Sequence, residues 1–488
     1  MNMQNFQTNW MTHLITVTAT VMVGGCTVGP DYESPTIDMP ATWGSLSDEA
    51  VVDDHAVIPT SESKSLATWW LAFEDETLSA LIERAVRTNL DLHVAQVRVR
   101  EARARRGIAS ADLLPTVFGG GAYTRSRTSA NAYDDPTAGT EASLYQAGFD
   151  AIWEVDVFGG VRRNVEAAAA DIAASIEDRR DVLVTLLAEV AQNYAELRSY
   201  QRRIAIAQAN LEGQRETLAI TRMRLDAGLV SDLDVTRARA QVRTTESQIP
   251  ALESAARQSI HALSVLLAEP PTTLVAALSM SRPMLAAPDD VPVGLPSELL
   301  RRRPDIRRAE RELASITARV GVATAELFPR FSLTGSLGLS SSQFSDLGDY
   351  GSRFWSFGPS VSWPVFDFGR IRSNIDVQSA REEQALLRYE QVVLTSLREV
   401  EDALVAFTKE QSRRVALASA VDDNRRAAEL ADELYQQGLT DFLSVLQSQR
   451  DLLISEDALV QSDRAVVTQL VSLYKALGGG WEAETMVY

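Results

Sequence analysis

Apolar and polar residues alternate strictly in two stretches of the chain. Phe331, Leu333, Gly335, Leu337 and Leu339 occupy the odd positions of the first, and Ser, Thr and Gly fill the even ones. This period of two predicts strands with one apolar and one polar face, near 330–341 and 353–366. A second, weaker pair is predicted near 115–127 and 143–156.

Two long stretches follow the strand pairs and have a different period. Residues 371–437 contain neither Gly nor Pro, and 161–227 contain only Gly213, so each predicts a helix of 67 residues (437 minus 371, plus one). Apolar positions such as Val393, Val400 and Leu404 step by threes and fours, the coiled-coil repeat. At 1.5 Å per residue each helix would reach on the order of 100 Å.

Shorter helices flank these long ones. Return helices are expected at 229–267, with a kink at Pro250, and at 439–477, each after a Gly suited to a helix C-terminus. Helical runs at 77–112 and 305–327 end at Leu-Pro and Phe-Pro pairs, just before the strands.

The whole succession occurs twice. Trp153, Phe158 and Gly159 recur as Trp363, Phe368 and Gly369, and Gly228 and Leu229 recur as Gly438 and Leu439, always 210 positions apart (363 minus 153, and 438 minus 228). One spacing held over so long a segment indicates duplication of a long unit. The sequence therefore divides into an N-terminal extended segment (26–76), a first repeat (77–290), a second repeat (296–477) and a C-terminal tail (478–488).

Strands of about ten residues are long enough to cross a bilayer when tilted, although half of a water-soluble sandwich has the same pattern. Four strands cannot close a transmembrane barrel, and an open edge in lipid leaves backbone groups unpaired. Membrane insertion would therefore require oligomerisation. A dimer would supply eight strands and a trimer twelve, and the pattern alone does not choose between them.

The charge balance and the rarity of histidine exclude other functions. The 47 Lys and Arg residues against 66 Asp and Glu give a net charge of −19, which disfavours nucleic acid as a partner. His13, His55, His93 and His261 are far apart and have no Cys or acidic neighbours at ligand spacing. We expect neither a metal site, nor a cofactor, nor an enzyme.

The only cysteine lies in an informative place. A short apolar run, 14–23, is followed by Val23-Gly24-Gly25-Cys26, which resembles a bacterial lipobox after the apolar core of a signal peptide. We expect residues 1–25 to be removed and Cys26 to carry covalent lipid, which would anchor the chain. One feature departs from the usual pattern, since 1–25 contain no Lys or Arg.

Several motifs together resemble the TolC-like outer membrane factor family, in its lipoprotein branch associated with efflux. They are Cys26-Thr27-Val28-Gly29-Pro30-Asp31-Tyr32, Trp69-Trp70, Asn89-Leu90-Asp91, Leu299 to Arg307 with Arg303-Pro304-Asp305, Ala309-Glu310, Phe328-Pro329 and Trp363 to Gly369.

The resemblance implies a mixed α and β membrane protein. Its homotrimer would share a 12-stranded transmembrane β-barrel, four strands from each protomer, continued by a long periplasmic α-helical coiled-coil barrel. The protein would be lipid-anchored in the cell outer membrane and extend into the periplasm. It would passively conduct small toxic molecules to the exterior from an inner membrane efflux pump and a periplasmic adaptor protein.

The resemblance also implies a periplasmic gate. In the family a Tyr and an Arg near the last hairpin reach an Asp on a neighbouring hairpin; Tyr435 and Asp234 match, but Thr440 stands at the Arg position. Asp441 resembles the acidic constriction of the lipoprotein branch, where a ring of carboxylates would narrow the pore. The alternative is that Asp441 and Asp232 only cap helices.

The hairpin tips are the expected docking site for the adaptor. Leu and Val are unusual in a solvated turn and suit docking, although staples within each hairpin are the alternative. The docking residues are Gly228, Leu229, Val230, Gly438 and Leu439. Two other functions compete with the efflux channel: the exit duct of a type I protein secretion system, and a periplasmic coiled-coil adaptor or scaffold. The sequence names neither the cargo nor the pump.

Overall fold

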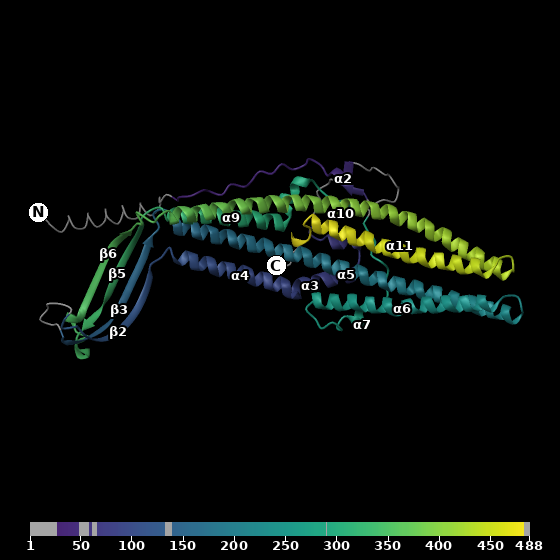
Figure 1. Ribbon diagram of the computed structural model, residues 1–488, viewed down its shortest axis with the longest axis horizontal. Coiled ribbons are helices and arrows are strands. Elements are labelled where there is room, and N and C mark those ends of the chain that lie inside the picture. The colour runs from purple at the N-terminus through teal and green to yellow at the C-terminus, as the bar shows by residue number, and fades with distance from the viewer. Residues whose placement is uncertain (1–26, 48–57, 61–65, 132–138, 289, 483–488) are drawn as a thin grey trace. The chain divides into compact units, whose positions relative to one another are not determined.

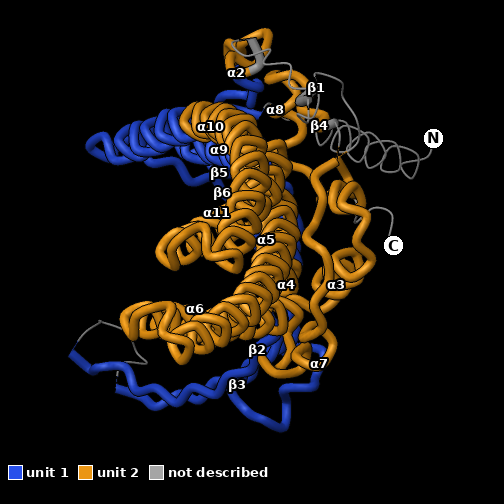
Figure 2. The backbone as a smooth tube through the Cα atoms, turned by 90° about the vertical axis from the view of Figure 1, so that its right-hand side faces the viewer, with its two compact units in different colours: residues 1–36, 98–175, 308–389 blue, residues 37–97, 176–307, 390–488 orange. Residues whose placement is uncertain are grey.

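The structure is a computed structural model, and it describes residues 27–47, 58–60, 66–131, 139–288 and 290–482. The chain forms two compact units, coloured separately in Figure 2. Unit 1 comprises residues 1–36, 98–175 and 308–389, and unit 2 comprises 37–97, 176–307 and 390–488. Each unit therefore draws on both repeats of the sequence.

Unit 1 contains a four-stranded antiparallel sheet. Its strands are β2 (Thr116–Arg127), β3 (Glu141–Val155), β5 (Arg330–Ser341) and β6 (Arg353–Ser362), in the order β2-β3-β5-β6 (Figure 1). The two hairpins join through β3 and β5, where Phe149 is opposite Leu337. The last strand ends at Ser362, short of the predicted 366, and it accommodates Pro359 because β6 is an edge strand.

The long helices are α5 (Gly160–Asp226) and α10 (Arg370–Gln436), each of 67 residues. They are followed by α6 (Asp232–Leu266) and α11 (Phe442–Ala476), each of 35 residues. Helix α5 continues through Gly213, and α6 continues through Pro250. Within unit 2, Val393, Val400 and Phe407 of α10 are fully buried, as expected for the inner positions of a helix bundle.

The predicted single helix over 77–112 is wrong. The structure has α3 (Glu76–Thr88) and α4 (Leu90–Ala111), separated at Asn89. The Asn89 side chain accepts a hydrogen bond from the Leu92 N–H and donates one to the Leu266 carbonyl, both at 2.9 Å. The break therefore provides an N-terminal cap for α4 and a tie to the end of α6.

The helix predicted over 305–327 is confirmed to within two residues, but two short helical segments precede it. Helix α9 spans Pro304–Ala325, after the short η2 (Pro296–Glu298) and α8 (Leu299–Arg302). Pro304 stands at the first position of α9, where its missing N–H costs nothing.

The N-terminal segment is only partly extended. It contains α2 (Gly44–Ser47), β1 (Ile58–Thr60) and η1 (Trp69–Phe73), and β1 pairs in parallel with β4 (Asp290–Pro292). Trp43, Trp69 and Trp70 of this segment are buried. A short α7 (Val275–Leu278) and the turns η3 (Phe344–Asp346) and η4 (Tyr350–Ser352) complete the elements.

The first residues of the expected C-terminal tail are packed in unit 2. Gly478 has φ +72°, and a Cβ there would lie 3.0 Å from the Arg303 Cα. The Trp481 indole N–H donates to the Arg302 carbonyl at 2.9 Å, and Arg180 lies 4.3 Å from the ring. The predicted start of the tail at 478 is therefore wrong, because residues 478–481 are packed in unit 2.

Candidate functional site

The two faces of the sheet differ in chemistry. Phe149, Leu337 and Trp355 are opposite one another across β3, β5 and β6, and 62%, 61% and 70% of their surfaces are exposed. The next row faces the other way and contains Asp150, with Ser336 and Ser356 hydrogen-bonded at 2.8 Å. An exposed apolar face is unfavourable in water and suited to lipid.

Aromatic side chains lie near both ends of the strands. Tyr123 and Tyr145 are paired with ring centroids 4.6 Å apart, and Phe344 lies 5.6 Å from Tyr145. At the opposite end, the indoles of Trp153 and Trp363 donate to the Leu113 and Leu327 carbonyls, at 2.9 and 3.0 Å. These two carbonyls lie two residues before the prolines that end α4 and α9.

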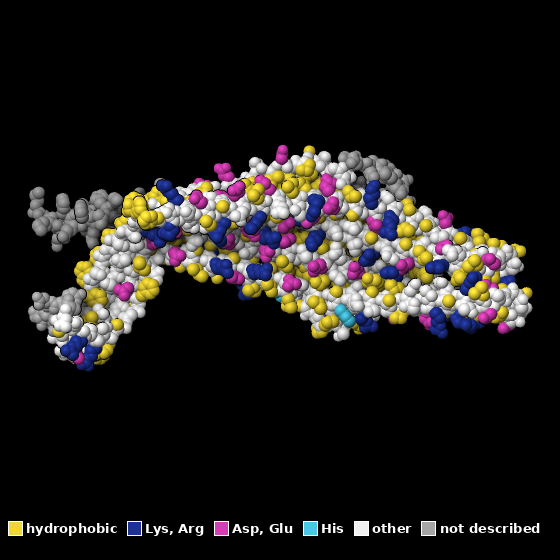
Figure 3. Space-filling view, viewed as in Figure 1, with side chains coloured by type: hydrophobic (Ala, Val, Ile, Leu, Met, Phe, Trp, Pro, Cys, Tyr) yellow, Lys and Arg dark blue, Asp and Glu magenta, His cyan; other side chains and the backbone are white. Residues whose placement is uncertain are grey.

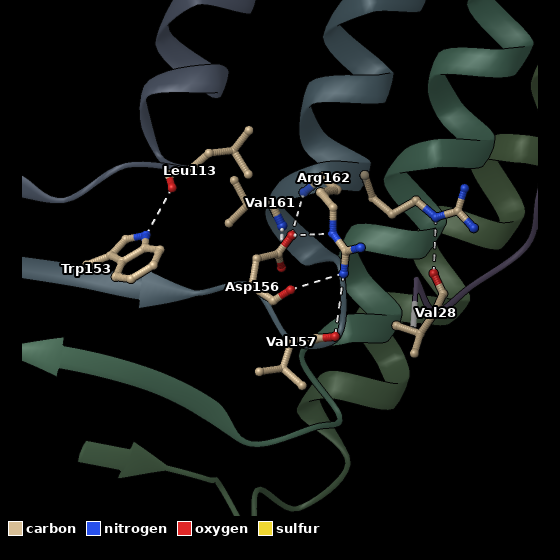
Figure 4. A network of polar contacts seen from close by, with 8 residues as sticks. Val28, Leu113, Trp153, Asp156, Val157, Val161 and Arg162 are labelled. Carbon is tan, nitrogen blue, oxygen red and sulfur yellow. Dashed lines mark hydrogen bonds and ion pairs between the residues drawn. The ribbon is translucent and has the colours of Figure 1, made fainter. Parts of the chain in front are cut away.

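A carboxylate organises the turn from β3 into α5, as Figure 4 shows. Asp156 accepts from the Val161 and Arg162 backbone N–H groups at 3.1 and 2.9 Å, and from the Arg162 guanidinium at 3.2 Å. In the second repeat Asp367 accepts from the N–H groups of Gly369 and Ile371. The hydrogen bond from Ile371 lowers the pKa of Asp367, so α10 begins on an ionised carboxylate.

The N-terminal residues of the described chain are tied to the same turn. The Val28 N–H donates to the Phe158 carbonyl at 3.2 Å, and the Arg163 guanidinium donates to the Val28 carbonyl at 3.2 Å and to Asp31 at 2.6 Å. Gly29 has φ +91°, and a Cβ there would lie 2.4 Å from the Gly321 Cα. Cys26, the expected lipid-bearing residue, lies outside the described residues.

The same segment is held further along by Glu310, which accepts from the Tyr32 hydroxyl at 3.0 Å and from the Ser34 hydroxyl at 3.1 Å. Burial raises the pKa of Tyr32 to about 12, although the hydrogen bond with Ser34 opposes the shift. Tyr32 is therefore a neutral hydrogen-bond donor at physiological pH.

Within unit 2, both long helices end in the same kind of turn. Gly228 and Gly438 have φ +73° and +76°. The N–H groups of the following Leu229 and Leu439 donate to carbonyls five residues back, in each case at 2.8 Å. This is the Schellman motif, which requires a left-handed residue and explains the repeated glycine.

A Ser and an Asp three residues apart form the start of the second helix in each hairpin. The Ser comes first in one hairpin and the Asp comes first in the other. Ser231 precedes α6, and its N–H and hydroxyl donate to Asp234 at 3.1 and 2.9 Å. Asp441 precedes α11 and accepts from the Ser444 N–H and hydroxyl at 3.0 and 2.7 Å. Both expected gate carboxylates therefore bond within their own hairpins, and Asp232 is not the capping residue.

These bonds determine the protonation state of Asp441. The hydrogen bonds from the Ser444 side chain and backbone lower the pKa of Asp441 below its ordinary value of 3.8. The carboxylate is thus negative at any physiological pH and is exposed to solvent. Thr440, at the expected arginine position, is half-buried.

Tyr435 is the buried centre of the tip, with only 2% of its surface exposed. It packs in a cluster with Leu218, Val235 and Val445, and its ring meets Phe442 edge-on at 5.8 Å. Arg224 lies over the other side of the ring, 4.5 Å from the centroid. The sequence alone did not single out Arg224, and the repeat gives no signal there, because residues 221–227 and 431–437 differ at every position.

The tip residues expected to dock a partner are exposed. Leu229 and Leu439 are 66% and 70% exposed, and Leu233 and Leu443, one turn into the following helices, are 55% and 51% exposed. Such exposure argues against leucine staples packed inside each hairpin. Acidic and basic side chains alternate over the visible helical surface, and apolar atoms show at the hairpin ends (Figure 3).

Among the described residues, no group of three or more His, Cys, Asp or Glu side chains is placed to hold a metal ion. None of the described helices combines the length and apolar character needed to span a bilayer.

Comparison with known proteins identifies the class. The family model described as outer membrane efflux protein matches residues 81–269 and 295–479, one segment in each repeat. The chain is 32% identical to nodulation protein T of Rhizobium leguminosarum bv. trifolii, over 94% of this chain and 96% of the relative. It is 34% identical to the solvent efflux pump outer membrane protein SrpC of Pseudomonas putida, over 95% of this chain and 97% of the relative.

A solved structure agrees with these relatives. The outer-membrane channel OprN superposes with a TM-score of 0.87 at 38% identity, covering 94% of this chain and 100% of that one. The chain belongs to the outer membrane efflux protein family. It is an outer membrane efflux channel and not an enzyme.

Proposed function

We propose that three copies of this chain form one outer membrane duct. It receives small toxic molecules from an inner membrane pump through a periplasmic adaptor protein and conducts them passively to the exterior. One observation carries the proposal, namely a four-stranded sheet whose edge strands, β2 and β6, pair with no further strand in the described chain.

Closure of this sheet accounts for the trimer. Each unpaired backbone group in lipid costs several kcal/mol, so β2 of one protomer pairs with β6 of the next until the sheet closes. Three protomers give twelve strands. The apolar face with Phe149 and Trp355 then meets lipid, and the polar face with Ser336 and Ser356 lines the bore.

The anchor and the docking surface lie in different units. Acyl chains on Cys26 hold the mature N-terminus at the membrane, where Val28 and Arg163 fix the adjoining segment to the turn that follows β3. At the hairpin ends, Leu229, Leu233, Leu439 and Leu443 form an exposed apolar surface that suits the adaptor.

The gate lies at those same hairpin ends in this proposal. Three exposed Asp441 carboxylates, one from each protomer, form a negative ring that narrows the bore and attracts cations. Asp234 and Tyr435 hold the shape of the hairpins on which that ring is mounted.

Deletion and complementation test the function. A strain lacking the gene should become sensitive to dyes, antibiotics or organic solvents, and the wild-type gene should restore resistance. If export of a protein substrate is lost while sensitivity to small molecules is unchanged, the duct serves type I secretion instead.

A further inference from the structure

A cavity of about 370 Å³ lies within unit 2 between α5, α10 and α11. Two polar links between α5 and α11 lie along it: Asn210 donates to Glu456 at 3.0 Å, and Gln449 donates to Thr217 at 2.9 Å. Because residues 210 and 217 are seven positions apart on α5, the links are separated by about 10 Å along the helix. A cavity of this volume is within the range of small-molecule sites.

The lining of the cavity includes a glycine from the middle of a long helix. Gly213 lies in the interior of α5, where glycine is less favourable than any residue except proline. A Cβ at this position would meet nothing within 4 Å, so close packing within the chain does not require glycine there. Glycine at 213 therefore lowers helix stability and enlarges the cavity at the same time.

The neighbouring Gln214 is buried and lines the same cavity, with only 4% of its surface exposed. Neither its Nε2 nor its Oε1 has a hydrogen-bond partner among the described residues. A buried carboxamide without partners costs free energy, and it needs both an acceptor and a donor to be satisfied. A ligand with hydroxyl groups supplies both, because a hydroxyl donates and accepts.

The lining is also acidic. It contains the carboxylates of Glu216, Asp432 and Glu456 and no Lys, Arg or His. Arg425, which is outside the lining, pairs with Glu456 at 3.1 Å, and Asp432 accepts from the neutral Gln436 at 2.8 Å. The remaining negative charge favours a cation. Since the described residues place no group of three ligands for a metal ion, an organic cation fits this cavity better.

We propose that this cavity binds a small organic amine that also carries hydroxyl groups, such as an amino sugar. The ammonium group of the ligand lies against the carboxylates of Asp432 and Glu456, and its hydroxyls pair with the carboxamide of Gln214. The inference goes beyond the proposed duct and does not rest on it, because every lining residue belongs to one protomer.

Titration of the purified full-length protein in detergent with glucosamine, followed by ligand-detected NMR at low ionic strength, tests the proposal. The wild type should bind glucosamine saturably. Glucose, which lacks the ammonium group, and putrescine, which lacks hydroxyls, should each bind at least about tenfold more weakly. Added salt should weaken the binding of glucosamine, because the attraction is between charges.

Variants connect the binding to this cavity. Gly213→Leu fills the cavity and favours the helix, so it should abolish binding in a folded protein. Gln214→Leu should weaken binding about tenfold and raise the melting temperature, because it removes a buried polar group that lacks partners. Asp432→Asn should also weaken binding about tenfold. Glu433→Gln removes an exposed carboxylate beside it, outside the lining, and is the matched control that should bind as the wild type does.

The proposal is overturned if the wild type does not bind glucosamine, if glucose or putrescine binds equally, or if Gly213→Leu binds as the wild type does. Equal losses in Asp432→Asn and Glu433→Gln would also overturn it, because the overall charge of the protein would then explain the binding. A Gln214→Leu protein less stable than the wild type would show that the carboxamide serves the fold and not a ligand. None of these results bears on the proposed duct, which the drug sensitivity of the deletion strain tests separately.

Discussion

The Arg303 cluster allows a quantitative prediction about stability. The guanidinium donates to both Asp305 oxygens at 2.9 and 2.6 Å and to the Ala476 carbonyl at 2.8 Å, and it lies 2.8 Å from Glu399. Only 9% of its side chain is exposed. Burial alone would lower the pKa of Arg303, but the hydrogen bonds and charges of Asp305 and Glu399 outweigh burial and raise it.

Arg303→Met keeps the apolar stem and removes the charge. Breaking a buried ion pair costs about 3–5 kcal/mol, and the lower end applies here because Glu399 is half-exposed and regains water. We therefore expect a loss of about 3 kcal/mol in the free energy of unfolding. Arg398→Ala removes an exposed pair, 4.0 Å from Asp402, and should cost less than about 0.5 kcal/mol.

The assay is equilibrium unfolding of detergent-solubilised protein at one fixed concentration, because the stability of an oligomer depends on concentration. Tryptophan fluorescence is a suitable signal, since Trp481 lies beside the cluster and donates to the Arg302 carbonyl. An Arg303→Met protein as stable as the wild type would refute the reasoning. Equal losses in Arg303→Met and Arg398→Ala would refute it too.

Three further predictions concern the tip and the N-terminus. Asp441→Ala should increase leak through the channel, whereas Asp232→Ala should not, and unchanged conductance and antibiotic uptake in Asp441→Ala would remove the carboxylate ring from the account. The pKa of Asp441 in the folded protein lies below 3.8, so the stability that its cap gives to the start of α11 is complete above pH 3.8. This stability is lost as the pH falls through the lower folded pKa. The Ser444 amide should therefore exchange faster only in such acid. Gly29→Ala should detach the segment around Val28 and speed its proteolysis, because a Cβ at Gly29 would clash with Gly321. Gly358→Ala is the control and should not, because a Cβ there meets nothing within 4 Å. Equal cleavage of both variants would contradict the packing of this segment against Gly321.

Local patterns were sufficient to predict the strands of the four-stranded sheet and the long helices that follow them. Alternation at 330–341 and the absence of Gly and Pro over 371–437 placed β5 and α10 to within one residue. Helix α10 ends just before Gly438, whose left-handed backbone conformation suits a glycine that follows a helix. Gly228 has the same left-handed conformation at the end of α5.

What sequence reasoning missed depends on contacts between distant residues. The break at Asn89 is stabilised by a bond to Leu266, 177 residues away, and helix-favouring residues flank it on both sides. Arg224 meets a carbonyl 211 residues away, and Val28 pairs with Phe158. No local pattern encodes such pairs, and comparison of the repeats does not single them out, because residues 221–227 and 431–437 differ at every position.

Cross-linking of the sheet edges tests the central claim most directly. Cysteines introduced in pairs, one on the edge strand β2 and one on β6, at a few successive registers, should yield covalent trimers on oxidation of outer membranes, and the single-cysteine variants should not. Trimers at one register would show that β2 of each protomer lies against β6 of the next. Monomers at every register, or a ladder that stops at dimers, would contradict a barrel shared by three copies.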